Sequence, residues 1–336
     1  MANAKKSPTI YDVAKLSGVS ISTISRVLNA PDKVNPETRQ LVMSAIDKLG
    51  FVPKAEARAR ALKNTNRIGV ITPFFTAPSF VQRLRGVAST LSRANYELVI
   101  YPVDSVEHLQ GYISSIPIMG NLDGLIIMSL AIEDQDVRRL IENGMQTVLI
   151  EFSHDELNSI VINDEQGGRL VAEYLLKKGH RSFGFLGDIE PPERYAIHPV
   201  KSRLQGFTAV LDDAGVGLPK KNIKQALYAH ENSRQAAEDL LTRNNPPTAI
   251  FAASDIQALS VMKVARQLKL KIPDDLAIIG FDDIDMADYV DLTTIRQHLD
   301  ESGRLSAEMV LARIGDPDRT LQHISLPLTL IERATV

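Results

Sequence analysis

The chain has 336 residues, of which 44% are hydrophobic, so its length suits a small module followed by a larger domain with an extensive core. It contains no cysteine, which excludes disulfides, thiolate metal sites and cysteine nucleophiles. It has no apolar run of about 20 residues. Its polar, basic start lacks a secretory signal, so we expect a cytoplasmic protein that does not enter a membrane.

Charge is distributed unevenly along the chain. The formal net charge is −3, but residues 1–67 hold 12 Lys and Arg against five Asp and Glu, which gives this segment +7 and leaves −10 for the rest. A basic segment on an acidic body predicts a polyanionic partner for that segment, although a merely solvated basic face is the alternative.

Three short helices are predicted in the basic segment. Thr9 begins the first, and Gly18, which tolerates a positive φ, ends it. Ser20 begins the second as an N-cap, and Asn35-Pro36 begins a third that ends at Gly50. Two short helices joined by a glycine turn and closed by a third are typical of a helix-turn-helix domain, with a generic three-helix bundle as the alternative.

The second helix is the candidate DNA recognition helix. Ile21, Ser22 and Arg26 lie near its start and one turn later, so these side chains can face a major groove together. Short polar side chains nearby suit hydrogen bonds to DNA phosphates. The candidate phosphate contacts are Thr9, Tyr11, Ser20, Thr23, Ser25 and Asn29.

Residues 9–29, which read TIYDVAKLSGVSISTISRVLN, resemble the N-terminal signature of the lactose/galactose repressor family over 21 contiguous positions. The resemblance implies a homodimer that binds a pseudo-palindromic, double-stranded operator. It also places Ile21, Ser22 and Arg26 at the base-reading positions. Motifs similar to those of the family continue to the end of the chain, at residues 161–168, 179–181, 203–207, 253–255, 280–283 and 292–297.

The segment after Pro53 is rich in alanine and arginine and can form a helix on binding. The resemblance makes it the hinge helix, which enters the minor groove at the operator centre and inserts a leucine between base pairs. Here Arg60 stands where the family leucine usually lies, and Leu62 comes two residues later. We therefore expect Arg60 to be the main contact, in a narrow A·T-rich groove. The candidate minor-groove residues are Ala57, Arg58, Arg60 and Leu62.

From residue 68 onward, short apolar runs alternate with helical stretches. This pattern predicts an α/β body in which parallel sheets are covered by helices on both faces. The resemblance implies a two-lobed, periplasmic-binding-protein-like domain with the ligand between its lobes. The expected segments are 1–52 (helix-turn-helix), 53–67 (hinge helix and linker) and 68–336 (effector binding and dimerisation), with the N-lobe at about 68–164 and 295–323 and the C-lobe at about 165–290 and 326–336.

Ligands of parallel sheets lie beyond the carboxyl ends of the strands. Asp282 follows one apolar run, and its carboxylate can accept hydrogen bonds from vicinal hydroxyls, with a helix cap as the alternative. Arg203 offers a planar fork of donors, with a surface salt bridge as the alternative. By resemblance, these two residues are the polar anchors of the pocket. The other candidate effector contacts are Phe74, Phe75, Ser79, Tyr228 and Ser254.

The predicted effector is a small polar molecule. Phe74 and Phe75 follow the first strand and can stack on a sugar ring or a base, with a place in the core as the alternative for Phe74. We favour a sugar over a purine or nucleoside, because Asp282 and Arg203 suit hydroxyls and no base-specific amide pair is visible.

Nothing in the sequence indicates a cofactor, a metal or catalysis. No GxGxxG, GxxxxGK[ST] or GxSxG motif follows a strand, and the histidines lack metal-ligand spacing. A solute-binding protein is disfavoured by the missing signal and the +7 segment, and an enzyme by the lack of a nucleophile with its base. We therefore predict a ligand-responsive, sequence-specific transcription regulator, with repression favoured. We expect dimers rather than tetramers, because no heptads follow the last apolar run.

Overall fold

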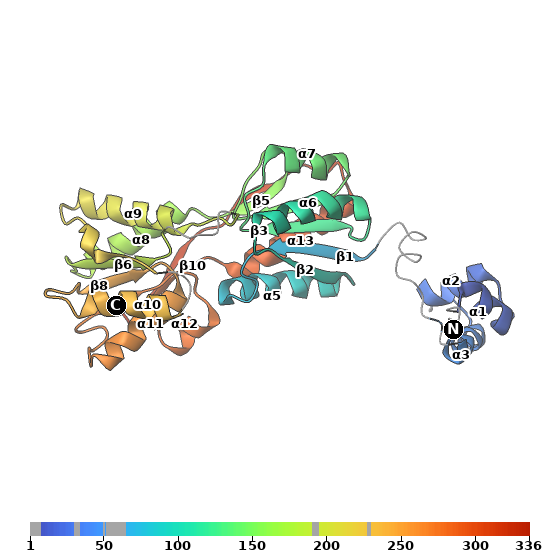
Figure 1. Ribbon diagram of the computed structural model, residues 1–336, viewed down its shortest axis with the longest axis horizontal. Coiled ribbons are helices and arrows are strands. Elements are labelled where there is room, and N and C mark those ends of the chain that lie inside the picture. The colour runs from blue at the N-terminus through green and yellow to red at the C-terminus, as the bar shows by residue number, and fades with distance from the viewer. Residues whose placement is uncertain (1–7, 30–33, 50, 52–64, 190–194, 227–229) are drawn as a thin grey trace, which may run out of the picture. The chain divides into compact units, whose positions relative to one another are not determined.

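The computed structural model describes residues 8–29, 34–49, 51, 65–189, 195–226 and 230–336. The chain divides into two compact units, Met1–Thr65 and Asn66–Val336. The first unit is helical, and the second alternates strands with helices over most of its length (Figure 1). The predicted fold class, a helical module followed by an α/β body, is confirmed.

Three helices form the first unit: α1 (Ile10–Ser17), α2 (Ile21–Asn29) and α3 (Pro36–Leu49). Gly18 ends α1 with a left-handed φ of 70°. The hydroxyl of Ser20 accepts the backbone N–H of the residue three positions later, at 3.2 Å, and so caps α2. A small apolar core joins the three helices, consisting of Val13, Ile24, Val27, Val42 and Ala45.

Two parallel sheets form the second unit. The larger has six strands in the order β11-β5-β4-β3-β1-β2, so β2 lies at an edge. Its strands are β1 (Arg67–Thr72), β2 (Glu97–Pro102), β3 (Gly124–Met128), β4 (Gln146–Ile150), β5 (Asn158–Val161) and β11 (His323–Ser325).

Four helices cover the two faces of the six-stranded sheet: α5 (Pro78–Arg93) and α13 (Leu299–Gly315) lie on one face, and α6 (Val106–Met119) and α7 (Asp134–Glu142) lie on the other (Figure 1). Side chains of a strand alternate between faces. Ile68 and Val70 therefore pack with α5 and α13, whereas Ile71 packs with α6 and α7. Burial on both faces explains why β3, in the interior of the sheet, is apolar throughout.

The smaller sheet has four parallel strands in the order β7-β6-β8-β9. Its strands are β6 (Phe183–Gly187), β7 (Ile223–Gln225), β8 (Ala249–Ala252) and β9 (Ala277–Ile279). Its helices are α8 (Asp164–Lys177), α9 (Val200–Asp213), α10 (His230–Leu241), α11 (Asp255–Gln267) and the short α12 (Asp285–Tyr289), with a 3₁₀ turn at Lys220–Asn222.

Glycines let two helix pairs approach closely. A Cβ on Gly86 of α5 would lie 2.0 Å from the carbonyl oxygen of Asp300 in α13. A Cβ on Gly206 of α9 would lie 1.9 Å from the carbonyl oxygen of Glu165 in α8. Larger residues would force these helices apart, so the glycines fix the position of α9, which carries Arg203, against the start of α8.

The chain passes between the two sheets more than once. It leaves the six-stranded sheet after β5, returns through β10 (Thr294–Arg296) to α13, and leaves again from β11 to β12 (Thr329–Ile331). β10 and β12 pair antiparallel, and β10 lies beside the end of β9, where the backbone N–H of Asp282 donates to the carbonyl oxygen of Ile295. This arrangement allows a site to form between two separately packed lobes.

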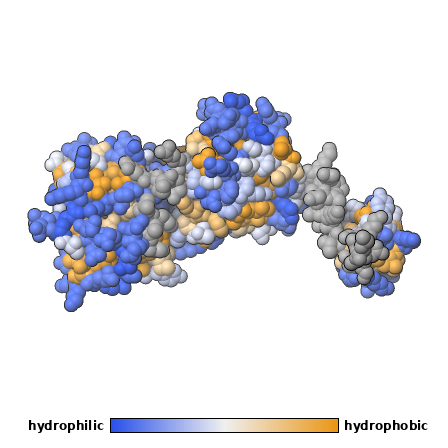
Figure 2. All heavy atoms as spheres, in the orientation of Figure 1, coloured by the Kyte–Doolittle hydropathy of each residue, from blue (hydrophilic) through white to orange (hydrophobic). Residues whose placement is uncertain are grey.

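The surface of the second unit is polar over some helices and apolar over others. Figure 2 shows hydrophilic residues over α7 and more hydrophobic ones on the side that carries α5 and β2. Val81 of α5 is 50% exposed and Ile100 of β2 is 37% exposed. Within the described residues, no helix combines the length and hydrophobicity that a membrane crossing requires.

Candidate functional site

Helix α2 has one buried and one exposed face. Ile24 and Val27 are buried in the core of the first unit, whereas Ile21, Ser22 and Arg26 are exposed. The three candidate base-reading side chains are therefore all available on the surface. Ile21 is 39% exposed although it is apolar, which suits contact with a thymine methyl group.

Four of the six candidate phosphate contacts lie at two helix N-termini. Thr9 is exposed, and Tyr11 is 70% exposed in the first turn of α1. The Ser20 hydroxyl lies 2.8 Å from that of Ser22 and 2.9 Å from that of Thr23, at the start of α2. Helix N-termini present free N–H groups and the positive end of the helix dipole, both of which favour phosphate.

Among the remaining predicted residues, Ser25 is described and is half-buried. Several others lie outside the described part of the chain. The side chain of Asn29 is not described, and neither are the hinge candidates or Tyr228. The hinge candidates are Ala57, Arg58, Arg60 and Leu62.

A cleft of about 330 Å³ lies between the carboxyl ends of the two sheets. Its lining comes from both lobes, because the loops after β1 and β4 contribute from one side and those after β6, β8 and β9 from the other. Five predicted effector contacts line it together, namely Phe74, Ser79, Arg203, Ser254 and Asp282. Phe75, which is 39% exposed, is not among the lining residues, so the structure does not support its predicted place in the site.

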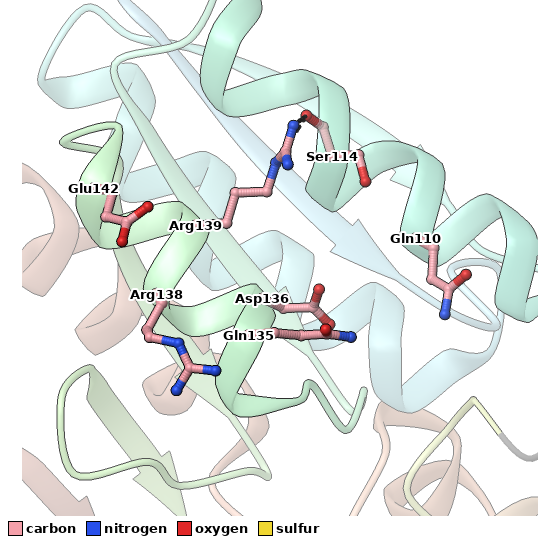
Figure 3. Close-up of a pocket in the computed structure, with 7 residues that line it drawn as sticks. All are labelled: Gln110, Ser114, Gln135, Asp136, Arg138, Arg139 and Glu142. Carbon is pink, nitrogen blue, oxygen red and sulfur yellow. Dashed lines mark hydrogen bonds between the residues drawn. The ribbon is translucent and has the colours of Figure 1, made fainter.

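A second hollow of about 470 Å³ lies between α6 and α7 (Figure 3). Its side chains are mostly exposed, and Arg139 of α7 already donates to the carbonyl oxygen of Ser114 in α6 at 2.8 Å. It draws only on helices of one lobe and holds no fully buried polar group. The cleft between the sheets is therefore the stronger candidate site.

Arg203 is held rigidly in one wall of the cleft. It is 4% exposed, its Nε donates to Asp164 at 2.8 Å, and its Nη1 donates to the carbonyl oxygen of Ala253 at 2.6 Å. Its guanidinium carbon lies 3.7 Å from the centre of the Phe281 ring, a cation–π contact. The surface salt-bridge alternative is therefore wrong, because the side chain is buried.

Asp282 lies beside Arg203, with its Oδ1 3.9 Å from Arg203 Nη1. The same oxygen accepts a hydrogen bond from Gln297 Nε2. Burial raises the pKa of Asp282 to about 7, although the guanidiniums of Arg203 and Arg83 oppose this rise. The N-cap of α12 is Ile284, so the helix-cap alternative for Asp282 is wrong.

The neighbouring polar residues of this wall have mainly structural contacts. The Ser254 hydroxyl accepts the backbone N–H of Gln257 at 3.3 Å and so caps α11, while its face lines the cleft. Asp255 is fully buried and accepts from the Thr294 hydroxyl and from the backbone N–H of Ile284. Burial, with the charge of Asp282 beside it, raises the pKa of Asp255.

The opposite lobe contributes a buried ion pair that the sequence analysis missed. Arg83 of α5 is 3% exposed and its Nη2 pairs with Glu151, which directly follows β4. Burial alone would raise the pKa of Glu151, but the Arg83 guanidinium and a hydrogen bond from Ser129 hold it below its usual range. The rule that pointed to Asp282, a carboxylate just after a strand, would also have found Glu151.

Aromatic side chains form a third part of the wall. Phe74 is 39% exposed, so the core alternative is wrong for it, and its ring packs edge-on against Phe80 with centroids 6.1 Å apart. Phe80 is half-buried and also lines the cleft. A phenyl face at this place can stack on the apolar face of a ring.

The backbone is strained at the edge of the cleft. Phe74, Ser129, Glu151 and Asp282 follow β1, β3, β4 and β9 by no more than three residues, and their φ values are 45°, 53°, 66° and 125°. Such conformations cost energy for residues other than glycine and concentrate at functional sites. In the described residues, no group of three or more His, Asp or Glu side chains could hold a metal ion.

The raised pKa of Asp282 predicts a pH-dependent stability difference. In the folded chain this carboxyl keeps its proton up to about pH 7, whereas in the unfolded chain it ionises near pH 4. Its contribution to stability is therefore present below pH 4 and is lost as pH rises to about 7. Relative to the wild type, Asp282→Asn should gain up to about 4 kcal/mol between pH 4.5 and 8, measured by urea unfolding. A constant difference between the two proteins across this range would contradict the assignment.

Comparison with known proteins gives two matching family models. Residues 9–54 match the model described as bacterial regulatory proteins, lacI family, and residues 172–336 match a periplasmic binding protein-like domain. The HTH-type transcriptional regulator DegA of Bacillus subtilis (strain 168) is 32% identical over 334 residues, covering 97% of each chain.

Two solved structures are similar to this chain over nearly its whole length. The lac repressor dimer bound to operator and the anti-inducer ONPF has a TM-score of 0.79 and 26% identity, covering 98% of this chain and 99% of that one. The complex of transcriptional regulator CelR with cellobiose has a TM-score of 0.69 and 26% identity, covering 98% of this chain and 100% of that one.

Proposed function

We propose that this chain, which belongs to the lacI family of bacterial regulatory proteins, is a homodimeric repressor whose operator affinity changes when a small carbohydrate binds in the cleft. As a member of that family it is a ligand-responsive transcription regulator. The finer statement, that the ligand is a carbohydrate held between the lobes, rests on the chemistry of the cleft.

The observation that carries the proposal is the juxtaposition of Asp282, Arg203 and Phe74 around one cavity. A carboxylate accepts hydrogen bonds from neighbouring hydroxyls, a guanidinium donates to them, and an aromatic face stacks on the C–H side of a sugar ring. The cavity of about 330 Å³ lies at the small end of the range for ligand sites, which favours a sugar of one or two rings. Cellobiose in the similar CelR structure supports this class of ligand.

A homodimer is supported by the surface that carries α5 and β2. β2 is an edge strand, and exposed apolar side chains on both elements favour burial against a partner. The similar lac repressor structure is a dimer bound to operator. A second copy of this chain would provide the second recognition helix that a pseudo-palindromic operator requires.

Contacts between the lobes outside the cleft provide a route for the ligand response. Arg85 of α5 donates to Asp300 of α13 and to Asp285 of α12 with both ends of its guanidinium. Gln82 of α5 accepts the backbone N–H of Asp285 at 2.8 Å. Because the contacts with Asp285 join α5 to the opposite lobe, closing the cleft on a ligand would shift α5 and the proposed dimer surface with it.

An electrophoretic mobility shift experiment tests the proposed function. The full chain should bind the promoter DNA upstream of its own gene and of its neighbours, and one sugar of a panel should change the apparent Kd by about fivefold or more, as expected for allosteric coupling. A thermal-shift screen of sugars and nucleobases selects the ligand. Binding to random DNA with equal affinity would contradict sequence-specific regulation, and a response to a nucleobase alone would contradict the carbohydrate.

A further inference from the structure

We propose that Arg83, Glu151 and Gln297 make the cleft selective for a neutral, hydroxyl-rich ligand and exclude its carboxylated analogue. This inference rests on the proposed function, in which a carbohydrate binds in the cleft. It identifies a second polar anchor, on the lobe opposite Asp282 and Arg203, and assigns that anchor a part in specificity.

Arg83 has the position that such an anchor needs. It lines the cleft from α5 and is 3% exposed. Its Nη2 contacts Glu151 and lies 3.2 Å from Gln297 Oε1, but its Nε has no hydrogen-bond partner among the described residues. The Nε is enclosed by protein atoms, so a ligand hydroxyl would accept from the part of the guanidinium that lines the cleft.

Gln297 links the two anchors. It lies where the chain passes from β10 to α13, and its Oε1 accepts from Arg83 while its Nε2 donates to Asp282 Oδ1. The side-chain amide of Gln297 can make both hydrogen bonds only when its oxygen faces Arg83 and its nitrogen faces Asp282. Because Oδ1 of Asp282 takes the Gln297 hydrogen bond and also faces Arg203, its Oδ2 is the oxygen left to accept from a ligand hydroxyl.

The charges of the cleft do not accommodate an anion. Each guanidinium already has a carboxylate in contact: Arg83 pairs with Glu151, and Arg203 with Asp164 at 2.8 Å. Among the described lining residues, Asp282 and Asp188 are two further acidic groups, against the imidazole of His198. A carboxylate on the ligand would find no guanidinium without a carboxylate partner among those residues and would face Glu151 and Asp282, so its desolvation would not be repaid.

Calorimetry of the full chain with matched neutral and acidic sugars tests the inference. The probes are D-glucose, D-galactose, D-ribose and cellobiose, compared with D-glucuronate and D-galacturonate. We expect the wild type to bind a neutral sugar at least about tenfold more tightly than its uronate. Arg83→Leu should weaken the neutral sugar about 10- to 100-fold, since it removes a charged donor.

Glu151→Gln tests whether Glu151 acts in specificity, because a purely structural role would not change the ratio of neutral-sugar to uronate affinity. It keeps the shape of the side chain but leaves Arg83 without its anion, so the preference for the neutral sugar over the uronate should shrink by about tenfold or more. In the double variant Arg83→Leu/Glu151→Gln, uronate binding should not improve relative to neutral-sugar binding, because the guanidinium is also absent. Arg93→Leu, on the same helix but outside the cleft, is the matched control and should bind like the wild type.

The outcomes separate this inference from the proposed function. A wild type that prefers a uronate, or a Glu151→Gln variant that discriminates as strongly as the wild type, would overturn the inference and leave a carbohydrate regulator standing. Two outcomes would contradict both the inference and the proposed function. In one, the protein binds hypoxanthine but none of the four sugars and two uronates; in the other, it binds none of these seven compounds. If circular dichroism shows Arg83→Leu to be unfolded, Arg83→Lys, which keeps the charge but lacks the guanidinium, must show the loss of neutral-sugar affinity.

Discussion

Asp282→Asn should abolish the ligand response while leaving operator binding unchanged. At pH 8, above the pKa of about 7, the substitution replaces an ionised acceptor with a neutral one at the centre of the cleft, and hydrogen bonds to a charged group are worth about 1.5–3 kcal/mol. Ligand affinity should therefore fall at least about tenfold. Because Asp282 does not cap a helix and its burial opposes ionisation, the fold should be retained. Calorimetry with the identified ligand, together with mobility shifts in its presence and absence, measures both effects.

Asp288→Asn is the matched control for this substitution. Asp288 lies on α12 with a side chain that is 82% exposed, and it is absent from the lining of the cleft. It should respond to ligand like the wild type. An Asp282→Asn protein with unchanged ligand affinity would show that the Asp282 carboxylate does not contact the ligand.

Arg26→Ala should weaken specific operator binding by about 1–3 kcal/mol for each half-site. Arg26 is exposed on α2, on the same face as Ile21 and Ser22, and its bidentate fork suits O6 and N7 of a guanine. The loss should be concentrated at one base pair of each half-site, so that changing this base pair costs the variant little. Competition binding against operators with single substitutions measures this preference.

Arg39→Ala distinguishes base reading from general attraction to DNA. Arg39 lies exposed on α3, outside the recognition helix, so its loss should leave sequence preference intact. If Arg26→Ala weakens operator and random DNA equally, its guanidinium contacts only phosphate. In that case Ile21 and Ser22 would remain as the candidate readers.

Local sequence patterns were sufficient to predict the helix-turn-helix unit. Gly18 at the turn and Ser20 as a cap act on neighbours within a few residues, so their effect can be read directly from the chain. The apolar strands of the body could be predicted equally well, because a strand that is buried on both faces consists mainly of apolar residues. The place of Asp282 in the cleft could be predicted because a residue that follows a parallel strand lies at the carboxyl edge of its sheet.

Only the tertiary structure decided which alternatives were right and which residues meet. Whether Arg203 formed a surface pair or a buried anchor depended on α8, whose close contact with α9 places Asp164 beside it. Arg83 is separated from Gln297 by more than 200 residues, and no local rule predicts that their side chains touch.

The sequence by itself therefore determined the fold class, the exposed face of α2 and one wall of the cleft, because each depends on periodicity, caps or strand ends. The opposite wall, formed by Arg83, Glu151 and Gln297, required the two lobes to be assembled. Its geometry results from packing between distant segments, and the energy of a buried ion pair depends on that packing rather than on the residues alone.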